Sequence, residues 1–356
     1  MRVIISAGGT GGHIYPALAI INKIQEEDKK SEFLYIGTHN RMEKDIVPKE
    51  NIPFIGIKVY GFTKNILKDI EALYLYSISY RKCIKIIKEF KPDIVIGVGG
   101  YVTVPLILAA HKLGIKTLIH EQNSIAGKAN IFLSKYVDKV CISVESSSKY
   151  FDQDKVVLTG NPCSSKAIKS TPMSKESLGL SKNKKLVLIV MGSLGAKTVF
   201  ELVSDTIPLF KGKDYEVLFI TGKNYYNDSL NDIAKNVKVV PYIDNLSSLL
   251  KNTDLVISRA GASILSELTS LNVPSILIPS PYVPNNHQYM NALDMVNNNA
   301  AYMIEEKDLT KDKLVDTIDS IINDTKKINN MKKSLKNMAI FNSDELIYNE
   351  IKKMVK

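Results

Sequence analysis

Residues 4–16 read IISAGGTGGHIYP, in which an apolar segment runs directly into four glycines before a helical pattern begins. A strand, a glycine turn and a helix in this order are typical of a doubly wound α/β domain. Glycines let another group approach the main chain closely, and the N–H groups at a helix N-terminus attract anions. The stretch therefore predicts a parallel sheet covered by helices, with an anion site beyond its first strand.

The same alternation of short apolar strands and helices continues along the chain and then restarts. We expect strands at residues 3–6, 33–36, 55–59, 94–98, 117–120 and 139–142, and, after residue 161, at 186–191, 216–221, 237–240, 255–258 and 275–279. Two series of this kind predict two doubly wound domains, 1–158 and 159–340, with a C-terminal helix at about 341–356 packing back on the first. Residues 159–181 are rich in Gly, Pro, Ser and Lys, which predicts a linker.

Composition and charge narrow the class of protein. The chain has 356 residues, 45% of them hydrophobic, which is enough for two cores. We expect no transmembrane helix and no signal peptide, and the three scattered cysteines predict free thiols in a reducing cytoplasm. The net charge of +10 suits nucleic acid, anionic lipid or a phosphorylated substrate. Because no nucleic-acid-binding motif occurs, we expect no nucleic acid partner.

Four glycine-containing turns follow predicted strands, at residues 8–12, 97–100, 192–196 and 260–263. One such turn alone could serve only a tight bend, but four at equivalent strand ends favour a phosphate-bearing ligand. NAD and FAD are disfavoured, because Ile14 stands where GxGxxG needs its last glycine and the second strand ends in Thr38 instead of an acid. The P-loop sequence GxxxxGK[ST] is also missing. A nucleotide-sugar fits the remaining possibilities.

Seven segments, in chain order, carry a resemblance to glycosyltransferase family 28 over essentially the whole chain: GGTGGHIYPALAI, RMEKDIVP, GVGGYVTVP, HEQNSIAGKAN, TGNP, SRAGASILSEL and NNHQYMNA. The resemblance is to the members that transfer N-acetylglucosamine (GlcNAc) from UDP-GlcNAc to the 4-hydroxyl of undecaprenyl-diphospho-N-acetylmuramoyl-pentapeptide, lipid I, which makes lipid II in peptidoglycan synthesis. It implies an α/β fold of the GT-B type, with two Rossmann-like domains facing across a cleft, and an inverting transferase peripheral to the cytoplasmic face of the cell membrane. No DxD-like motif stands at a strand end, so we expect no metal or other cofactor.

The resemblance also implies the site for UDP-GlcNAc in the second domain, with contacts from the first. The implied donor contacts are Thr10, Gly11, Gly12, Asn123, Ser164, Ser193, Ile243 through its backbone, Ala262, Ser263, Ile264, Leu265, Ser266, Glu267 and Gln288. Glu267 would accept hydrogen bonds from the ribose, although a carboxylate there can also simply compensate the helix dipole. Ser193 can equally be a helix cap, and Gln288 can be a polar surface residue that contacts no ligand.

Some positions depart from the family pattern. Ser164 stands where an arginine is common, and Lys166 could supply that charge. Met191 replaces a frequent glycine, and Phe200 replaces a polar residue of some members. These changes affect the expected diphosphate and uracil contacts and leave the reaction class unchanged.

Two residues are candidates for the general base. His13 follows the first glycine turn, and its imidazole could accept a proton from the attacking hydroxyl, although it could also only orient the loop. Glu121 is the rival base, or it could only fix the HEQN loop. The resemblance places the acceptor diphosphate at Gly9, Gly99, Gly100 and Tyr101.

The segment from residue 61 to residue 91 mixes apolar and basic side chains, which suits an anionic membrane surface. We expect Ile66, Leu67, Leu73 and Leu75 to contact the membrane, because the acceptor is a polyprenyl lipid. For residues 81–91 we favour an ordinary amphipathic helix with lysines in water.

Two other functions remain open at this point. A UDP-GlcNAc 2-epimerase or hydrolase of the same architecture would need no lipid acceptor and no apolar patch on the first domain. A non-catalytic nucleotide-sugar binding module would keep the glycine turns but would need neither His13 nor the HEQN loop. Neither alternative predicts binding to anionic vesicles.

Overall fold

The computed structural model describes residues 1–61, 63, 65–191 and 197–356, which form two compact units. Unit 1 comprises residues 1–165 and 342–356, and unit 2 comprises residues 166–341. The first segment of unit 1 ends at residue 165, whereas the sequence-based division ended the first domain at residue 158. The reason is that the amides of Thr159 and Gly160 both donate hydrogen bonds to the carbonyl of Ile142, which ties this segment to the first sheet.

Unit 1 is built on a seven-stranded parallel sheet with the order β3-β2-β1-β4-β5-β6-β7. Its strands are β1 (Arg2–Ser6), β2 (Glu32–Thr38), β3 (Phe54–Ile57), β4 (Ile94–Gly97), β5 (Lys116–Glu121), β6 (Lys139–Ile142) and β7 (Val156–Leu158). Ser6 pairs with Ile36 on one side and with Gly97 on the other. The order of the strands therefore reverses beside β1, the position where open α/β sheets bind their ligands.

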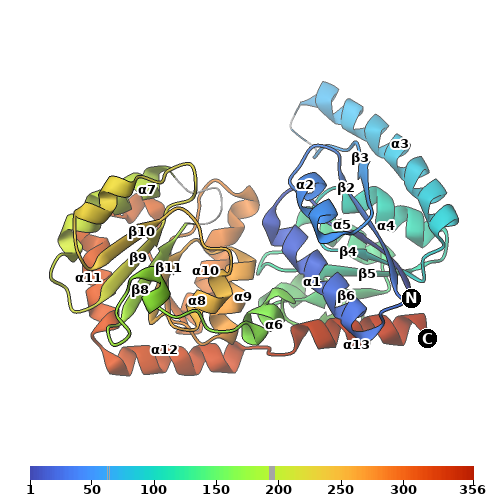
Figure 1. The fold of residues 1–356 in the computed structure, drawn as a ribbon. Helices are drawn as coiled ribbons and strands as arrows, with labels where there is room; N and C mark the ends of the chain where they lie inside the picture. The colour runs from blue at the N-terminus through green and yellow to red at the C-terminus, as the bar shows by residue number, and fades with distance from the viewer. Residues whose placement is uncertain (62, 64, 192–196) are drawn as a thin grey trace. The chain divides into compact units, whose positions relative to one another are not determined.

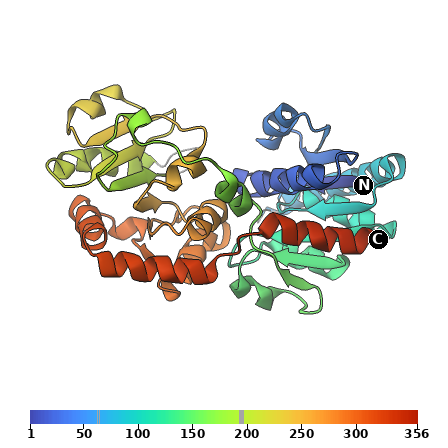
Figure 2. The ribbon, with the colours of Figure 1, turned by 60° about the horizontal axis from the view of Figure 1, so that its bottom comes forward.

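Helices cover both faces of this sheet. They are α1 (Gly11–Glu27), α2 (Glu43–Ile46), α3 (Ile66–Phe90), α4 (Thr103–Lys112), α5 (Lys128–Leu133) and α13 (Ser343–Val355), with short 3-10 helices η1 (Val47–Glu50), η2 (Ser134–Tyr136) and η3 (Glu145–Tyr150). Helices α1 and α13 lie side by side on one face, where Ile14, Ile21, Ile347 and Ile351 join one core (Figure 2). Helices α3 and α4, both labelled in Figure 1, contact each other. Their apolar side chains join the core of the other face.

Unit 2 repeats this plan with six parallel strands in the order β10-β9-β8-β11-β12-β13. The strands are β8 (Leu186–Val190), β9 (Glu216–Ile220), β10 (Val237–Val240), β11 (Leu255–Ser258), β12 (Ser275–Leu277) and β13 (Ala301–Met303). The helices are α7 (Lys197–Thr206), α8 (Leu246–Leu250), α9 (Ala262–Ser270), α10 (His287–Asn297), α11 (Lys311–Ile322) and α12 (Thr325–Met338), with 3-10 helices η4 (Glu176–Leu178), η5 (Ile207–Phe210), η6 (Asp228–Asp232), η7 (Pro284–Asn286) and η8 (Glu306–Asp308). Apolar side chains of α7 and α11 pack in one core and those of α9 and α10 in the other, and α12 contributes Ile328 and Met331 to the first and Leu335 to the second.

The predicted α/β class with two doubly wound parallel sheets is confirmed. The predicted linker differs, because helix α6 (Cys163–Lys169) begins within it, at the boundary between the units. The Asn161 side chain initiates this helix by accepting a hydrogen bond from the Cys163 amide. Among the described residues, no helix is both long enough and apolar enough to span a bilayer.

Candidate active site

The two glycine loops of unit 1 pack main chain against main chain at the carboxyl ends of β1 and β4. The Gly8 amide donates to the Gly99 carbonyl at 3.3 Å. Gly99 and Gly100 have φ angles of +108° and +87°, and a Cβ atom at Gly100 would lie 2.7 Å from the Gly8 oxygen. Only glycine fits this contact, so these two glycines have a packing role whether or not a ligand binds there.

His13 lies against this junction on the first turn of α1. A Cβ atom at Gly99 would lie 2.6 Å from Cδ2 of the histidine, and Nδ1 is 3.1 Å from the Gly8 carbonyl oxygen. Because a carbonyl only accepts hydrogen bonds, Nδ1 carries the proton, and in the neutral ring Nε2 is then the proton acceptor. This is the tautomer that a general base needs.

Glu121, the rival base, ends β5 with its side chain only 2% exposed. Its Oε1 accepts hydrogen bonds from the amide and the side-chain Nδ2 of Asn123 at 3.0 and 3.1 Å. Its Oε2 accepts from the Gly127 amide and from Asn130 Nδ2, both at 2.9 Å. With these four donors in place, the carboxylate could take a substrate proton only by breaking the loop, and the geometry favours its role in fixing the HEQN segment.

His120 and Gln122 of the same motif face inward, a role that the sequence did not suggest. His120 is fully buried, with Nε2 3.0 Å from the Gly160 carbonyl and Nδ1 2.8 Å from Gln122 Nε2. Burial lowers the pKa of His120, so the ring is neutral, donates from Nε2 and accepts at Nδ1. Gln122 Nε2 also donates to the Val98 carbonyl at 3.0 Å, which links the ends of β5 and β4.

The other unit 1 candidates lie on three different segments, at residues 10–12, at Tyr101 and at Ser164. Thr10 is exposed at the N-cap position of α1 and its side chain makes no capping hydrogen bond, whereas Gly11 and Gly12 form the first turn of that helix. The carbonyl of Tyr101 accepts a hydrogen bond from the Tyr76 hydroxyl at 3.2 Å. Ser164 is buried, and its hydroxyl donates to the Asn161 carbonyl at 2.8 Å, which gives it a role in starting α6, while its donor contact stays a prediction.

In unit 2 the candidate residues gather where α9 begins after β11. Main-chain N–H groups of the first helical turn have no partner within the helix and can bind an anion there. The Leu265 side chain is buried in the core and its N–H donates to the Gly261 carbonyl at 3.1 Å, while the Ser266 hydroxyl donates to the Ser263 carbonyl at 2.7 Å. The N–H groups that can bind an anion therefore belong to the residues of α9 before Leu265. Ile264 is partly buried against the same core.

Glu267 differs from Glu121 because, among the described residues, its carboxylate has a single hydrogen-bond donor, the Ser247 hydroxyl at 3.0 Å from Oε2. Burial raises its pKa to about 7, against the opposing effects of the Ser247 hydrogen bond and the Lys166 charge. A carboxylate with so few donors has the capacity to accept hydrogen bonds from a sugar.

Gln288, on α10, is fixed by its amide oxygen, which accepts a hydrogen bond from the Ser280 main chain at 2.9 Å. This leaves the amide NH₂ as the group that can contact a ligand, so Gln288 would act as a hydrogen-bond donor. Ile243, which follows β10, is partly buried against the core. Ser193 lies outside the described residues.

On α3 the structure corrects one prediction. Ile66, Leu67 and Leu73 are 77%, 79% and 59% exposed, whereas Leu75 is 8% exposed. Leu75 shares the inward face of the helix with Ala72 and Ser79, at helical spacing. The exposed set, which we call the α3 apolar patch, comprises Ile66, Leu67, Ile70, Leu73, Tyr74 and Ile78.

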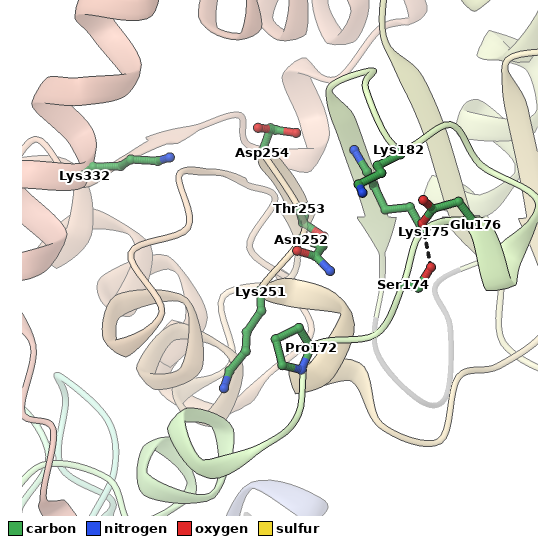
Figure 3. Close-up of a pocket in the computed structure, with 10 residues that line it drawn as sticks. All are labelled: Pro172, Ser174, Lys175, Glu176, Lys182, Lys251, Asn252, Thr253, Asp254 and Lys332. Carbon is green, nitrogen blue, oxygen red and sulfur yellow. Dashed lines mark hydrogen bonds between the residues drawn. The ribbon is translucent and has the colours of Figure 1, made fainter.

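A pocket of about 660 Å³ lies elsewhere in unit 2 (Figure 3). Asn252 and Asp254, which line it, precede β11, so the pocket is at the amino end of that strand. Lys251, beside it, donates to the carbonyls of Ile168 and Ser170 and so holds the chain after α6. Because open parallel sheets bind ligands at the carboxyl ends of their strands, this pocket is not the candidate site.

Comparisons with known proteins cover nearly the whole chain. The models described as the glycosyltransferase family 28 N-terminal domain and C-terminal domain match residues 3–142 and 186–346. A Bacillus cereus protein named UDP-N-acetylglucosamine–N-acetylmuramyl-(pentapeptide) pyrophosphoryl-undecaprenol N-acetylglucosamine transferase 1 is 46% identical over 100% of both chains. A Bacillus licheniformis transferase of the same name, without the number, is 42% identical over 99% of both.

Solved structures agree with this likeness. The crystal structure of Acinetobacter baumannii MurG covers 99% of both chains with a TM-score of 0.80 and 26% identity. A UDP-GlcNAc 2-epimerase from Neisseria meningitidis, bound to UDP-GlcNAc, covers 99% of this chain and 100% of its own with a TM-score of 0.68. Its identity is only 16%, so it supports the fold alone.

Proposed function

The chain belongs to glycosyltransferase family 28, and we propose that it transfers GlcNAc from UDP-GlcNAc to N-acetylmuramyl-(pentapeptide) pyrophosphoryl-undecaprenol, lipid I, forming lipid II. The observation that carries the proposal is the 46% identity, over the full length of both chains, to a transferase of that name. The geometry of unit 1 supports it, because the His13 tautomer and the ordered HEQN loop are features that a binding module would not need.

The reaction forms a bond between the acceptor 4-hydroxyl oxygen and C1 of GlcNAc and breaks the bond from C1 to the diphosphate oxygen. Attack from the face opposite UDP inverts C1. Nε2 of His13 takes the proton of the attacking hydroxyl, because Nδ1 already holds a proton against Gly8. The negative charge on the departing UDP is stabilised by main-chain N–H groups in the first turn of α9.

Further donor contacts follow from the unit 2 geometry. In this proposal the ribose hydroxyls bind the Glu267 carboxylate, which has spare acceptor capacity. The Gln288 NH₂ donates to an oxygen of the sugar, because its own carbonyl oxygen is held by Ser280.

We also propose that the protein acts at the cytoplasmic face of the cell membrane through the α3 apolar patch. Its side chains are exposed on one side of an amphipathic helix that also carries Lys68, Arg81, Lys82 and Lys85. Apolar side chains beside basic ones favour an anionic lipid surface, and the polyprenyl acceptor is embedded in one.

The proposed function is tested by measuring UDP release from UDP-GlcNAc with and without the lipid-diphosphate muramyl-pentapeptide. We expect release only with the acceptor, together with a β-1,4-linked disaccharide product. Release without the acceptor would indicate hydrolysis or epimerisation, and binding without release would indicate a binding module. We propose that no metal is needed, so the rate should be unchanged in EDTA, and loss of activity that Mg²⁺ restores would contradict this part.

A further inference from the structure

We propose that Glu43 is a positioning residue for this transfer, which fixes the peptide group between Gly8 and Gly9 and through it the His13 imidazole. The inference rests on the proposed function, because it assigns the role for that reaction. Glu43 opens helix α2, and its side chain is 0% exposed. A fully buried carboxylate needs hydrogen-bond donors around it, and those it has here reveal its role.

The carboxylate joins the end of β2 to the first glycine loop. Its Oε1 accepts hydrogen bonds from the Thr38 amide at 2.9 Å and from the Thr38 hydroxyl at 2.6 Å. Its Oε2 accepts a hydrogen bond from the Gly9 amide at 3.2 Å. Thr38 therefore anchors one oxygen, and the other holds the loop.

Two glycines make room for this side chain. A Cβ atom at Gly8 would lie 2.5 Å from Oε1 of Glu43, and one at Gly37 would lie 2.6 Å from its Cγ. Gly37 is the glycine of β2 just before Thr38. Both glycines are thus explained by the packing of Glu43, without a ligand.

The Gly9 N–H and the Gly8 C=O are the two ends of one planar peptide group. Glu43 accepts a hydrogen bond from its N–H, while Nδ1 of His13 donates to its C=O at 3.1 Å. Fixing one end of the plane fixes the direction of the other, and hydrogen bonds in a chain polarise one another. Glu43 therefore holds the carbonyl that sets the orientation and the tautomer of His13.

This arrangement also changes the expected role of Gly9. Its N–H is already used by a carboxylate, so it is not available to the acceptor diphosphate, and the negative charge behind it disfavours an anion at that point. Donors that remain in this loop include the N–H groups of the first turn of α1, at Gly11 and Gly12. An acid after the second strand usually binds a ribose in dinucleotide-binding domains, whereas this one is buried and directed at the loop.

Glu43→Gln is the sharpest test, because a glutamine side chain has one acceptor oxygen where glutamate has two. Its NH₂ group would then face either the Gly9 N–H or the Thr38 N–H, donor against donor, and one of these hydrogen bonds would be lost. Tyr35→Phe is the matched control, because it removes another buried hydrogen bond to this loop, from Tyr35 to the Ala7 carbonyl at 3.0 Å, without touching the Gly8–Gly9 peptide. Each variant is made in the wild-type and the His13→Ala backgrounds. Rate of UDP release, UDP affinity and thermal unfolding are measured for each.

We expect Glu43→Gln to lower kcat by about ten- to a hundredfold, with UDP affinity and Tyr35→Phe activity within about twofold of wild type. In the His13→Ala background, Glu43→Gln should lower kcat by no more than about a further twofold. The reason is that both substitutions remove the same function, proton transfer by a correctly oriented His13. A full additional loss in that background, a parallel loss of UDP affinity, or a wild-type rate for a folded Glu43→Gln protein would each overturn the proposal.

If Glu43→Gln does not fold, Glu43→Asp takes its place, because the shorter carboxylate cannot reach both Thr38 and Gly9. If neither folds, Glu43 is only a structural residue and the proposal fails. An inactive wild-type protein would instead reject the proposed function, which separates the two conclusions.

Discussion

The hydrogen-bond partners of three glutamates separate their roles: Glu43 and Glu121 are buried, whereas Glu267 is partly exposed. Glu43 accepts three hydrogen bonds, from Thr38 at the end of β2 and from the distant Gly9, and Glu121 accepts four from the segment that follows it. Glu267 accepts one from the part of the chain that the structure describes, and its pKa is raised to about 7. The saturated carboxylates hold the backbone in place, whereas the undersaturated one has capacity for a ligand.

The raised pKa of Glu267 predicts that UDP binding depends on pH. The ionised carboxylate makes stronger hydrogen bonds to the ribose hydroxyls than the protonated one, so affinity should weaken by up to about tenfold per unit as pH falls below about 7. Calorimetric titration with UDP between about pH 6 and 8 measures this. Glu267→Gln should bind UDP more weakly, by about tenfold, and with a flat pH profile.

The folding stability of the unliganded protein should depend on pH in the opposite direction to UDP affinity, which provides a second check. A folded-state pKa of about 7, above the ordinary 4.5, means that Glu267 contributes stability below about pH 4.5, which is lost as pH rises through 7. Glu267→Gln should remove this loss. A wild-type UDP affinity that stays constant over the same range would contradict the ribose assignment.

Sequence analysis identified most of these residues as candidates but could not predict their hydrogen-bond partners. The motif RMEKDIVP contains Glu43, yet only the fold brings its carboxylate to Gly9, which is 34 residues away in the chain. Likewise, the chemistry of Glu121 allowed it to be a base, and its four donors became visible only once the loop conformation was known. Residue type limits the chemistry that is possible, and long-range contacts decide which possibility is used.

At the level of elements, period and composition predicted all of the central strands, because a strand buried on both faces is a short run of apolar residues. The two strands that were missed, β7 and β13, have three residues each and lie at sheet edges. There the side chains are partly exposed and the sequence signal is weak, as at Leu158, which is 40% exposed. Edge strands depend on the sheet that they join.

Helix α3 shows the limit of a one-dimensional apolar pattern. Its first half is apolar on two faces, so sequence alone did not separate the inward Leu75 from the outward Leu73. The register of the helix on the sheet decides this, and Ala72, Ser79 and Cys83 mark the inward face. The outward face then extends to Ile70 and Tyr74, which were not predicted.

The α3 apolar patch predicts binding to anionic vesicles that depends on its apolar area. Replacing Leu67 and Ile70, which are 79% and 61% exposed, with glutamate should weaken sedimentation with phosphatidylglycerol vesicles by at least about tenfold. UDP affinity should be unchanged, because neither residue is among the candidate donor contacts. Leu209→Glu, at a 42% exposed position of unit 2, is the control and should leave vesicle binding at the wild-type level. Equal losses in both proteins would show that only net charge matters.

At the scale of the whole molecule, unit 1 is not a continuous stretch of sequence, because it includes the C-terminal residues of the chain. The family model for the C-terminal domain extends to residue 346, whereas the contacts return residues 342–356 to unit 1. Near the start of α13, the Asp344 amide donates to Ser165 Oγ at 3.2 Å, and Ser343 Oγ lies 3.2 Å from Ser164 Oγ. The domain division included a returning helix at about 341–356, but the sequence did not reveal these serine contacts.

This topology predicts that a change near the C-terminus loosens the unit that contains the N-terminus. Ile351 is fully buried on α13 in the core that includes Ile14 and Ile21 of α1, so Ile351→Ala should destabilise unit 1 by about 2–5 kcal/mol. A single unfolding temperature does not distinguish the stabilities of the two units. Hydrogen exchange measured on individual peptides does, because it reports local opening in each unit. Exchange should accelerate in α1 and β1 and stay at the wild-type rate in β8 and α11.

The matched control is Ile318→Ala, which removes an equally buried isoleucine from α11 in the core of unit 2. It should produce the reverse pattern, with faster exchange in β8 and unchanged exchange in α1. The two variants together distinguish local loosening from a general loss of stability, because each leaves one unit as the reference for the other. If Ile351→Ala accelerated exchange equally in both units, α13 would support the whole chain instead of unit 1, and the division inferred from the contacts would not describe how the protein unfolds.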